Sequence, residues 1–307
     1  MTRWWWIMGG LGLIAVVATG TVVFSTMARR STVDATKEML SMDASSSFTG
    51  VPSATSSNQI PAGRLRMVHD PIVKPGELAL RVPVLMYHYV RDLTPGMSTS
   101  SRWLSVSPEH FRAQMQEVVD GGYHAITPDE LDAALNGKAT LPAKPVMITF
   151  DDGYRDQYEN AFPMLKTLGL RATFFIITGY INHNSPVYVT PEMVKEMDAS
   201  SVATIGAHTK HHPELAKLKR ADQKDEIVGS KAYLESLLHH PVTSFAYPYG
   251  SYDDAVLKIV TDAGFHTAFT TLLGSVQTSS TRLELRRIRV LDDEHVGPIL
   301  QKFGSNE

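Results

Sequence analysis

The stretch VMITFDDGY, residues 146–154, is the part of this 307-residue chain that decides its fold. Residues 146–150 form a short, continuous apolar run, which is typical of a strand buried on both faces of a parallel sheet. Asp151, Asp152 and Gly153 follow the run at once. In parallel α/β folds, polar residues at the carboxyl ends of such strands form the active site, so the stretch predicts both a fold class and a site.

Similar apolar runs recur along the chain and alternate with helical patterns. Helices are predicted to begin after the capping residues Ser107, Thr127 and Thr190, each of which is followed by proline. The other predicted strands cover residues 82–87, 172–177, 203–207, 243–246, 266–270 and 287–290, with a shorter one at 124–126, and further helices cover residues 157–168, 221–238, 253–263 and 293–302. Seven or eight strands that alternate with helices predict a parallel sheet, either open or closed into a barrel.

Polar side chains follow four of these predicted strands. They are His88, the pair Asp151 and Asp152, His208 with His212 four residues later, and the segment YPYG at residues 247–250. The carboxyl ends of parallel strands in a barrel lie on one face, so we expect the four groups to come together in one site.

The aspartates and histidines together favour a metal. One of two adjacent carboxylates can bind a cation while the other accepts a proton from water, although a helix cap and a solvated turn residue explain Asp151 and Asp152 equally well when taken alone. Two imidazoles and one carboxylate are a common ligand set for a catalytic divalent cation. His208 and His212 have the spacing of one helical turn; His211 is nearly as well spaced from His208, and the flanking residues favour a tight loop.

Composition limits the kinds of function. The formal net charge is −3 and the sequence pI is about 6.5, so no nucleic-acid partner is expected. Cysteine is absent, which excludes disulfides, thiolate metal ligands and a cysteine nucleophile. Any metal must therefore be held by histidine, aspartate or glutamate.

The N-terminal part of the chain predicts export. Residues 7–24 form an uncharged apolar run of 18, preceded by Arg3 and three tryptophans, which suits a transmembrane anchor at residues 1–30; a cleaved signal peptide and a buried helix are the alternatives. Residues 31–77 are rich in Ser, Thr, Ala and Gly and predict a flexible stalk. The catalytic domain is predicted at residues 78–307, outside the cell on a membrane anchor or secreted.

Three short motifs give the chain a family resemblance. TFDDGY at residues 149–154, HTKHH at 208–212 and YPYG at 247–250 resemble the first three motifs of the polysaccharide deacetylase family, the NodB-homology domain of carbohydrate esterase family 4. They occur in the family's order, and the resemblance covers roughly residues 81–290.

The resemblance implies a role for each matching residue. Asp151 would be the general base, and a divalent metal, usually zinc in this family, would be bound by Asp152, His208 and His212. The backbone N–H of Tyr249 would stabilise the oxyanion.

The chain departs from the family in two places. No Leu-x-His motif occurs near the end of the domain, and Ala246 stands where an arginine usually opens the third motif. These departures, with VPVLMYH at residues 82–88, resemble the branch that deacetylates poly-β-1,6-N-acetylglucosamine. That branch points to His88 as the proton donor or a substrate-positioning residue, with a buried structural histidine as the alternative, and Arg287 is expected to steady Asp151 in place of the missing arginine.

Five aromatic residues and one arginine are the remaining candidates for sugar binding. Tyr154, Tyr247 and Arg287 are expected to lie at the substrate, and Trp103, Tyr180 and Tyr188 are predicted in loops where they can stack on sugar rings.

We therefore predict an α/β protein, a distorted parallel (β/α) barrel of about seven strands, preceded by one N-terminal transmembrane or signal helix. It is expected to be a monomeric, metal-dependent hydrolase that removes N-acetyl groups from an N-acetylglucosamine polysaccharide. Poly-β-1,6-N-acetylglucosamine is the preferred substrate; a peptidoglycan deacetylase and a catalytically inactive glycan-binding domain are the alternatives.

Overall fold

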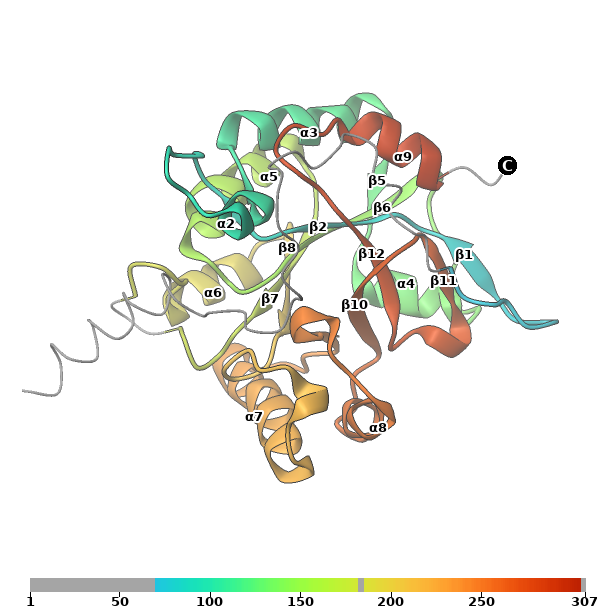
Figure 1. The fold of residues 1–307 in the computed structure, drawn as a ribbon. Helices are drawn as coiled ribbons and strands as arrows, with labels where there is room; N and C mark the ends of the chain where they lie inside the picture. The colour runs from blue at the N-terminus through green and yellow to red at the C-terminus, as the bar shows by residue number, and fades with distance from the viewer. Residues whose placement is uncertain (1–69, 182–184, 305–307) are drawn as a thin grey trace, which may run out of the picture. The chain divides into compact units, whose positions relative to one another are not determined.

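A closed parallel barrel forms the centre of the protein. The computed structural model describes residues 70–181 and 185–304. Its main sheet has the strand order β2-β12-β10-β9-β8-β7-β6-β5, and a further pairing between β2 and β6 closes seven of these strands into a ring (Figure 1). The expected distorted (β/α) barrel is thus confirmed, and the choice between an open and a closed sheet is decided by the β2–β6 pairing.

The barrel strands agree closely with the apolar runs of the sequence. They are β2 (Val84–Tyr87), β6 (Pro145–Phe150), β7 (Ala172–Ile176), β8 (Ala203–Ala207), β9 (Ser244–Ala246), β10 (Thr267–Leu273) and β12 (Leu285–Arg289). The short strand β5 (His124–Ala125) pairs with β6 outside the ring.

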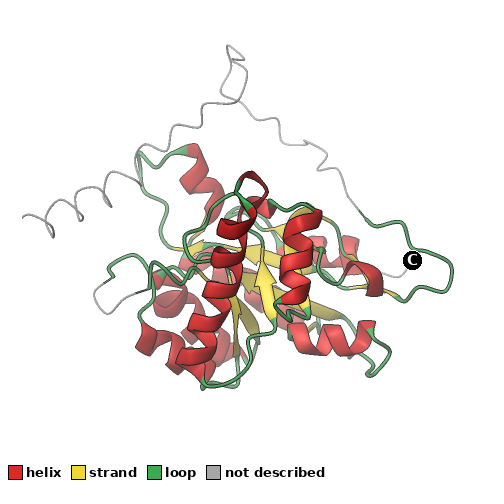
Figure 2. Cartoon of the chain, turned by 90° about the horizontal axis from the view of Figure 1, so that it is seen from below, coloured by secondary structure: helices red, strands yellow, loops and turns green. Residues whose placement is uncertain are grey.

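Helices surround the strands (Figure 2). They are α2 (Thr99–Leu104), α3 (Pro108–Asp120), α4 (Pro128–Leu135), α5 (Phe162–Leu168), α6 (Pro191–Asp198), α7 (Arg220–Leu238), α8 (Asp254–Asp262) and α9 (Val296–Gly304). The side chains of Ser107, Thr127 and Thr190 accept hydrogen bonds from backbone N–H groups in the first turns of α3, α4 and α6, as the sequence predicted.

Some short elements were not expected. Strand β1 (Ala79–Arg81) pairs antiparallel with β11 (Val276–Thr278), and the two-residue strands β3 (Tyr89–Val90) and β4 (Ser105–Val106) pair with each other. Trp103, predicted in a loop, lies in α2. The helix predicted at 157–168 begins as a π-helical turn, η1 (Gln157–Ala161), before α5.

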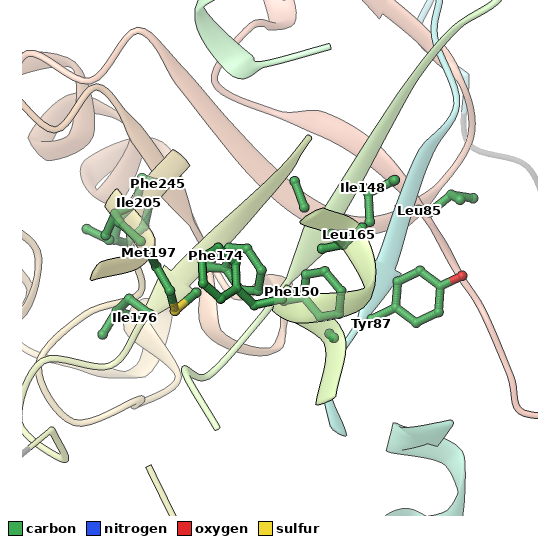
Figure 3. Packing of buried hydrophobic residues seen from close by; sticks show 14 of the residues in the cluster. Leu85, Tyr87, Ile148, Phe150, Leu165, Phe174, Ile176, Met197, Ile205 and Phe245 are labelled. Atoms are coloured by element: carbon green, nitrogen blue, oxygen red, sulfur yellow. The ribbon is translucent and has the colours of Figure 1, made fainter. Parts of the chain in front are cut away.

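Alternation of side chains along each strand divides the core into two clusters. The outer cluster lies between the strands and the helices; on its central strands Phe150 stacks on Phe174, with ring centroids 4.7 Å apart (Figure 3). The inner cluster fills the barrel with alternate residues, among them Met147, Phe175 and Phe269, together with side chains from α4. A residue one position beyond a strand therefore points either into the barrel mouth or into the outer layer, according to its parity.

The predicted membrane anchor at residues 1–30 and most of the predicted stalk lie outside the described residues. In the part of the chain that is described, no helix has the length and apolar character needed to cross a membrane.

Candidate metal centre and active site

The residues predicted to form a site do converge at the mouth of the barrel. His88 follows β2, Asp151 follows β6, His208 follows β8, and Arg287 lies in β12. All four occupy the same alternate positions along their strands as the residues of the inner cluster. Their side chains therefore point toward the barrel axis rather than toward the helices. Four separate strands thus deliver polar groups to one place.

Asp152, His208 and His212 form a group with the geometry of a metal site. Asp152 Oδ1 lies 3.3 Å from His208 Nε2 and 3.2 Å from His212 Nε2, and one ligand atom from each residue lies within 4.8 Å of the other two. His211, the competing histidine, is outside the group: its Nδ1 atom lies 2.8 Å from Glu226 Oε1, and its ring is largely exposed. The spacing of four residues is produced by a loop, because residues 208–214 contain no helix.

The donor set fits a divalent cation. Asp152 Oδ1 is buried and accepts no hydrogen bond from any described residue, although two imidazole nitrogens lie close to it. The other ring nitrogen of His208, Nδ1, lies 2.8 Å from Ala246 O, which fixes the tautomer so that Nε2 is left to bind a metal. Burial lowers the pKa of His212 to about 4, so its ring is neutral at pH 7 and able to act as a ligand.

Left-handed backbone conformations are concentrated around this group. Asp152, Thr209, His212 and Tyr249 have φ angles of 75°, 67°, 59° and 58°. Non-glycine residues rarely adopt this conformation, which costs of order 1–3 kcal/mol each and persists where surrounding contacts hold it. Two of the four, Asp152 and His212, belong to the proposed ligand group, and Thr209 and Tyr249 lie beside it.

Asp151 is held by a buried arginine. Arg287 Nη1 donates to Asp151 Oδ1 and Nη2 donates to Oδ2, both at 2.7 Å. Arg287 Nε donates to Thr270 O at 2.8 Å, which fixes the guanidinium plane. Burial alone would raise the pKa of Asp151, but the ion pair with Arg287 and the nearby His208 lower it to about 2. Asp151 is thus an ionised carboxylate at neutral pH, and the contact expected between Arg287 and Asp151 is present.

His88 lies near the same carboxylate oxygen of Asp151 that accepts from Arg287 Nη2. Its Nε2 atom is 4.0 Å from Asp151 Oδ2, and its side chain retains slight exposure. Burial lowers the pKa of His88 to about 4, against the opposite effect of the carboxylates of Asp152 and Asp151, so the ring is neutral at pH 7.

Gln157 links the two segments that carry these groups, and the sequence reasoning missed it. Its buried Nε2 atom donates to the backbone carbonyls of His88 and Asp151. Gln157 begins the π-helical turn η1, a rare form often found at functional sites. A glutamine inside a predicted helix carries no signal of such a contact.

Two residues expected at the substrate are too deeply buried to touch it. Tyr247 has no exposed surface, because the parity of β9 directs its ring into the outer cluster, where its hydroxyl donates to Leu283 O at 2.9 Å. The Arg287 side chain is also fully buried, and its outer nitrogens are occupied by Asp151. Arg287 therefore acts through Asp151 rather than on a substrate.

Tyr249 is exposed beside the metal group, and Tyr154 keeps part of its surface exposed. Tyr249 is 62% exposed, and its ring centroid is 4.6 Å from that of His212. Tyr154 is partly buried in a row of stacked rings: it lies between Tyr89, at 3.6 Å, and Tyr188, at 5.4 Å, and Tyr180 lies 5.0 Å beyond Tyr188. This tyrosine row, Tyr89–Tyr154–Tyr188–Tyr180, borders the metal group, since Tyr154 lies only two residues after Asp152 in the chain.

Comparison with known proteins agrees with this geometry. The sequence profile described as polysaccharide deacetylase matches residues 138–268. The Bacillus subtilis protein YxkH, for which polysaccharide deacetylase activity has been proposed, is 34% identical over 214 residues, which are 70% of this chain and 73% of that protein. The poly-β-1,6-N-acetyl-D-glucosamine N-deacetylase of Staphylococcus aureus is 28% identical over 205 residues, 62% of this chain and 70% of that protein.

A solved structure agrees as well. The Streptococcus pyogenes deacetylase PplD, in complex with acetate, matches with a TM-score of 0.67 and 31% identity, over 74% of this chain and 99% of that chain. The fold, the Asp-His-His group and these relatives lead to one conclusion: the chain belongs to the polysaccharide deacetylase family and is a deacetylase.

Proposed function

We propose that this deacetylase removes N-acetyl groups from poly-β-1,6-N-acetylglucosamine with the help of one zinc ion. The main support for the proposal is that Asp152, His208 and His212, which could hold a metal ion, lie next to the buried carboxylate of Asp151. Arg287 keeps this carboxylate ionised. A cation site and a fixed base side by side are what amide hydrolysis requires.

A zinc ion held by Asp152, His208 and His212 would polarise the acetamide carbonyl and make a bound water more acidic. Asp151 would accept the proton of the water that attacks the carbonyl carbon. Because the ion pair with Arg287 lowers the pKa of Asp151, the carboxylate is ionised at neutral pH and free to accept a proton.

His88 is the proposed proton donor to the leaving amine. Its ring is neutral at rest, so the proton that it delivers must arise within the same turnover, from the attacking water by way of Asp151. The separation of 4.0 Å between His88 Nε2 and Asp151 Oδ2 is longer than a hydrogen bond, and catalytic contacts in a substrate-free site often tighten on binding.

Tyr249 and Tyr154 are the proposed contacts for the sugar. The backbone N–H of Tyr249 would stabilise the tetrahedral oxyanion, and the exposed Tyr249 ring would cover the acetyl group from the side of His212. The partly buried Tyr154, in the tyrosine row, would lie along the glycan.

The choice of glycan rests on the Staphylococcus aureus relative, which acts on poly-β-1,6-N-acetyl-D-glucosamine and which this chain matches over 70% of its length. Ala246 in the third motif and His88 after β2, the first strand of the barrel, support the same choice. Peptidoglycan is the second candidate, because a membrane anchor and a stalk suit a cell-wall polymer equally well. Either polymer lies outside the cell, and we propose that the apolar run at residues 7–24 carries the domain there, anchored or secreted.

The test measures acetate release by the full chain, loaded with zinc and then stripped with a chelator, on poly-β-1,6-N-acetylglucosamine and on peptidoglycan. Asp151→Asn, which nearly preserves side-chain shape, serves as the control. Metal-dependent release from the first polymer that is lost in the control supports the mechanism and the substrate. Release from peptidoglycan alone overturns the substrate, and no release from either polymer by folded, zinc-loaded protein overturns the proposal in favour of a glycan-binding role.

A further inference from the structure

Glu226, which is remote from the reacting groups, holds the loop that carries two of the proposed metal ligands. It lies in α7 and is only 9% exposed. Its Oε2 atom accepts hydrogen bonds from the backbone N–H groups of Lys210, at 2.9 Å, and His211, at 2.8 Å. Its Oε1 atom lies 2.8 Å from His211 Nδ1. One carboxylate thus binds the two residues in the middle of the segment from His208 to His212.

The opposite edge of the same loop is bound by the segment after β7. Thr178 N–H donates to Thr209 O at 3.1 Å, and Gly179 N–H donates to Lys210 O at 2.7 Å. A Cβ atom at position 179 would lie only 2.4 Å from Lys210 O, so the loop fits against this segment only because residue 179 is glycine. The carbonyl groups of Thr209 and Lys210 therefore face one element, and the N–H groups of Lys210 and His211 face Glu226.

This double attachment is needed because the loop is strained. Thr209 and His212 both have left-handed φ angles, and a relaxed loop would leave this conformation. If the N–H groups of Lys210 and His211 lost their acceptor, the peptide planes between the two ligands would be free to rotate. We expect His212 then to shift relative to Asp152 and His208, because its own N–H is held only from within the loop, where it donates to Thr209 Oγ1 at 2.9 Å.

We propose that Glu226 is a positioning residue that sets the metal affinity of the site by holding His212 in place. The inference rests on the proposed metal site and adds to it a residue that never contacts the metal. Charged acceptors form the stronger hydrogen bonds, and residues that orient metal ligands typically change metal affinity by roughly 10- to 100-fold when removed.

The test compares Glu226→Ala, Glu226→Gln and Gln223→Ala with the wild-type full chain. Gln223 is the matched control, because it is also buried in α7, one turn away, but its Nε2 donates to Leu215 O and not to the histidine loop. Zinc affinity is measured by competition with a chelating dye, the geometry of the site by the absorption spectrum of bound Co²⁺, and stability by thermal unfolding of the metal-free protein.

We expect Glu226→Ala to weaken zinc binding by roughly 10- to 100-fold and to alter the Co²⁺ spectrum. Glu226→Gln keeps an oxygen that can accept from both backbone N–H groups, so it should bind zinc more tightly than Glu226→Ala. If the alanine variant does not fold, the zinc affinity of Glu226→Gln tests the proposal instead. Gln223→Ala should lower the unfolding temperature without changing zinc affinity.

Wild-type affinity in both Glu226 variants would overturn the inference, as would an equal loss of affinity in Gln223→Ala, which would indicate general destabilisation. If the wild-type protein itself binds no zinc, the proposed metal site fails first. The two failures are therefore distinguishable.

Discussion

Arg287 and Asp151 form a buried ion pair between residues 136 positions apart in the sequence. Removing one partner of such a pair leaves the other charge buried without compensation, which typically costs about 3–5 kcal/mol. We expect Arg287→Met to lower the free energy of unfolding by that amount, measured by urea denaturation of metal-free protein. The double variant Arg287→Met with Asp151→Asn should lose less than the sum of the two single variants. Additive losses would show that the two side chains do not interact energetically.

His88 is the residue on which the proposed proton transfer depends. We expect His88→Gln to lower kcat for acetate release by about 10²-fold or more, because general acid catalysis contributes on that scale, while zinc affinity stays unchanged. The exposed His124, which lies near the other end of β6, provides the matched control as His124→Gln. Full activity in His88→Gln would leave His88 as a structural residue and require another acid.

At the scale of elements, Asp156 joins strand β3 to the π-helical turn η1. Its Oδ1 atom accepts a hydrogen bond from Val90 N–H at 3.1 Å, and burial raises its pKa to about 6. The value in an unfolded chain is about 3.9. Between these two values the folded state binds more protons than the unfolded state, so the free energy of unfolding falls as pH rises from about 4 to about 6, and it levels off above that range.

Replacing Asp156 with asparagine tests the predicted fall in the free energy of unfolding as pH rises. Asparagine can keep the bond to Val90 without a charge, so Asp156→Asn should resemble wild type near pH 4. It should be more stable near pH 7, by on the order of 2 kcal/mol. Urea denaturation at both pH values is the measurement, with the exposed Asp222→Asn on α7 as control. A variant that is less stable at pH 7 would mean that the ionised carboxylate stabilises the fold.

The barrel strands and helix starts were predictable because their signals are local. A buried run such as residues 146–150 and a capping residue such as Thr127 carry their structural preference within a few positions. Strands β3 and β4 have two residues each and form only because the chain around them brings them together. No local pattern encodes such pairings.

The site followed the same division. The proposed metal ligands were found because they sit in short motifs after strands. Tyr247 was wrongly expected at the substrate because all residues of the YPYG motif were assigned to the site together. Side chains alternate between the two faces of a strand, and this alternation along β9 and the residue after it turns the Tyr247 ring toward the helices. Gln157 and Glu226 were missed because each forms hydrogen bonds with backbone groups of another segment. Every residue has such backbone groups, so the sequence of that segment gives no sign of the contact.

At the scale of the whole molecule, a bound metal would join loops that follow two different barrel strands, β6 and β8. A ligand that binds only the folded state stabilises it by about 2.7 kcal/mol when present at 100 times its Kd. Zinc should therefore raise the unfolding temperature of the full chain by several degrees, as measured by calorimetry, and a chelator should reverse the change. His212→Ala should lose most of this increase. An equal increase in that variant would place the zinc elsewhere.

The closure of the barrel has a consequence for how the protein matures. The ring is completed only when β12, the last strand of the ring to be synthesised, enters between β10 and β2, the first. A nascent chain that ends after residue 212 already contains the three proposed metal ligands, but the guanidinium that holds Asp151 is still missing. Such a chain also lacks Glu226, which holds the histidine loop, and Ala246, whose carbonyl oxygen lies 2.8 Å from His208 Nδ1. The residues that position the ligands and the base are thus synthesised after the residues that they position, so we expect only the complete barrel to bind metal and deacetylate a glycan.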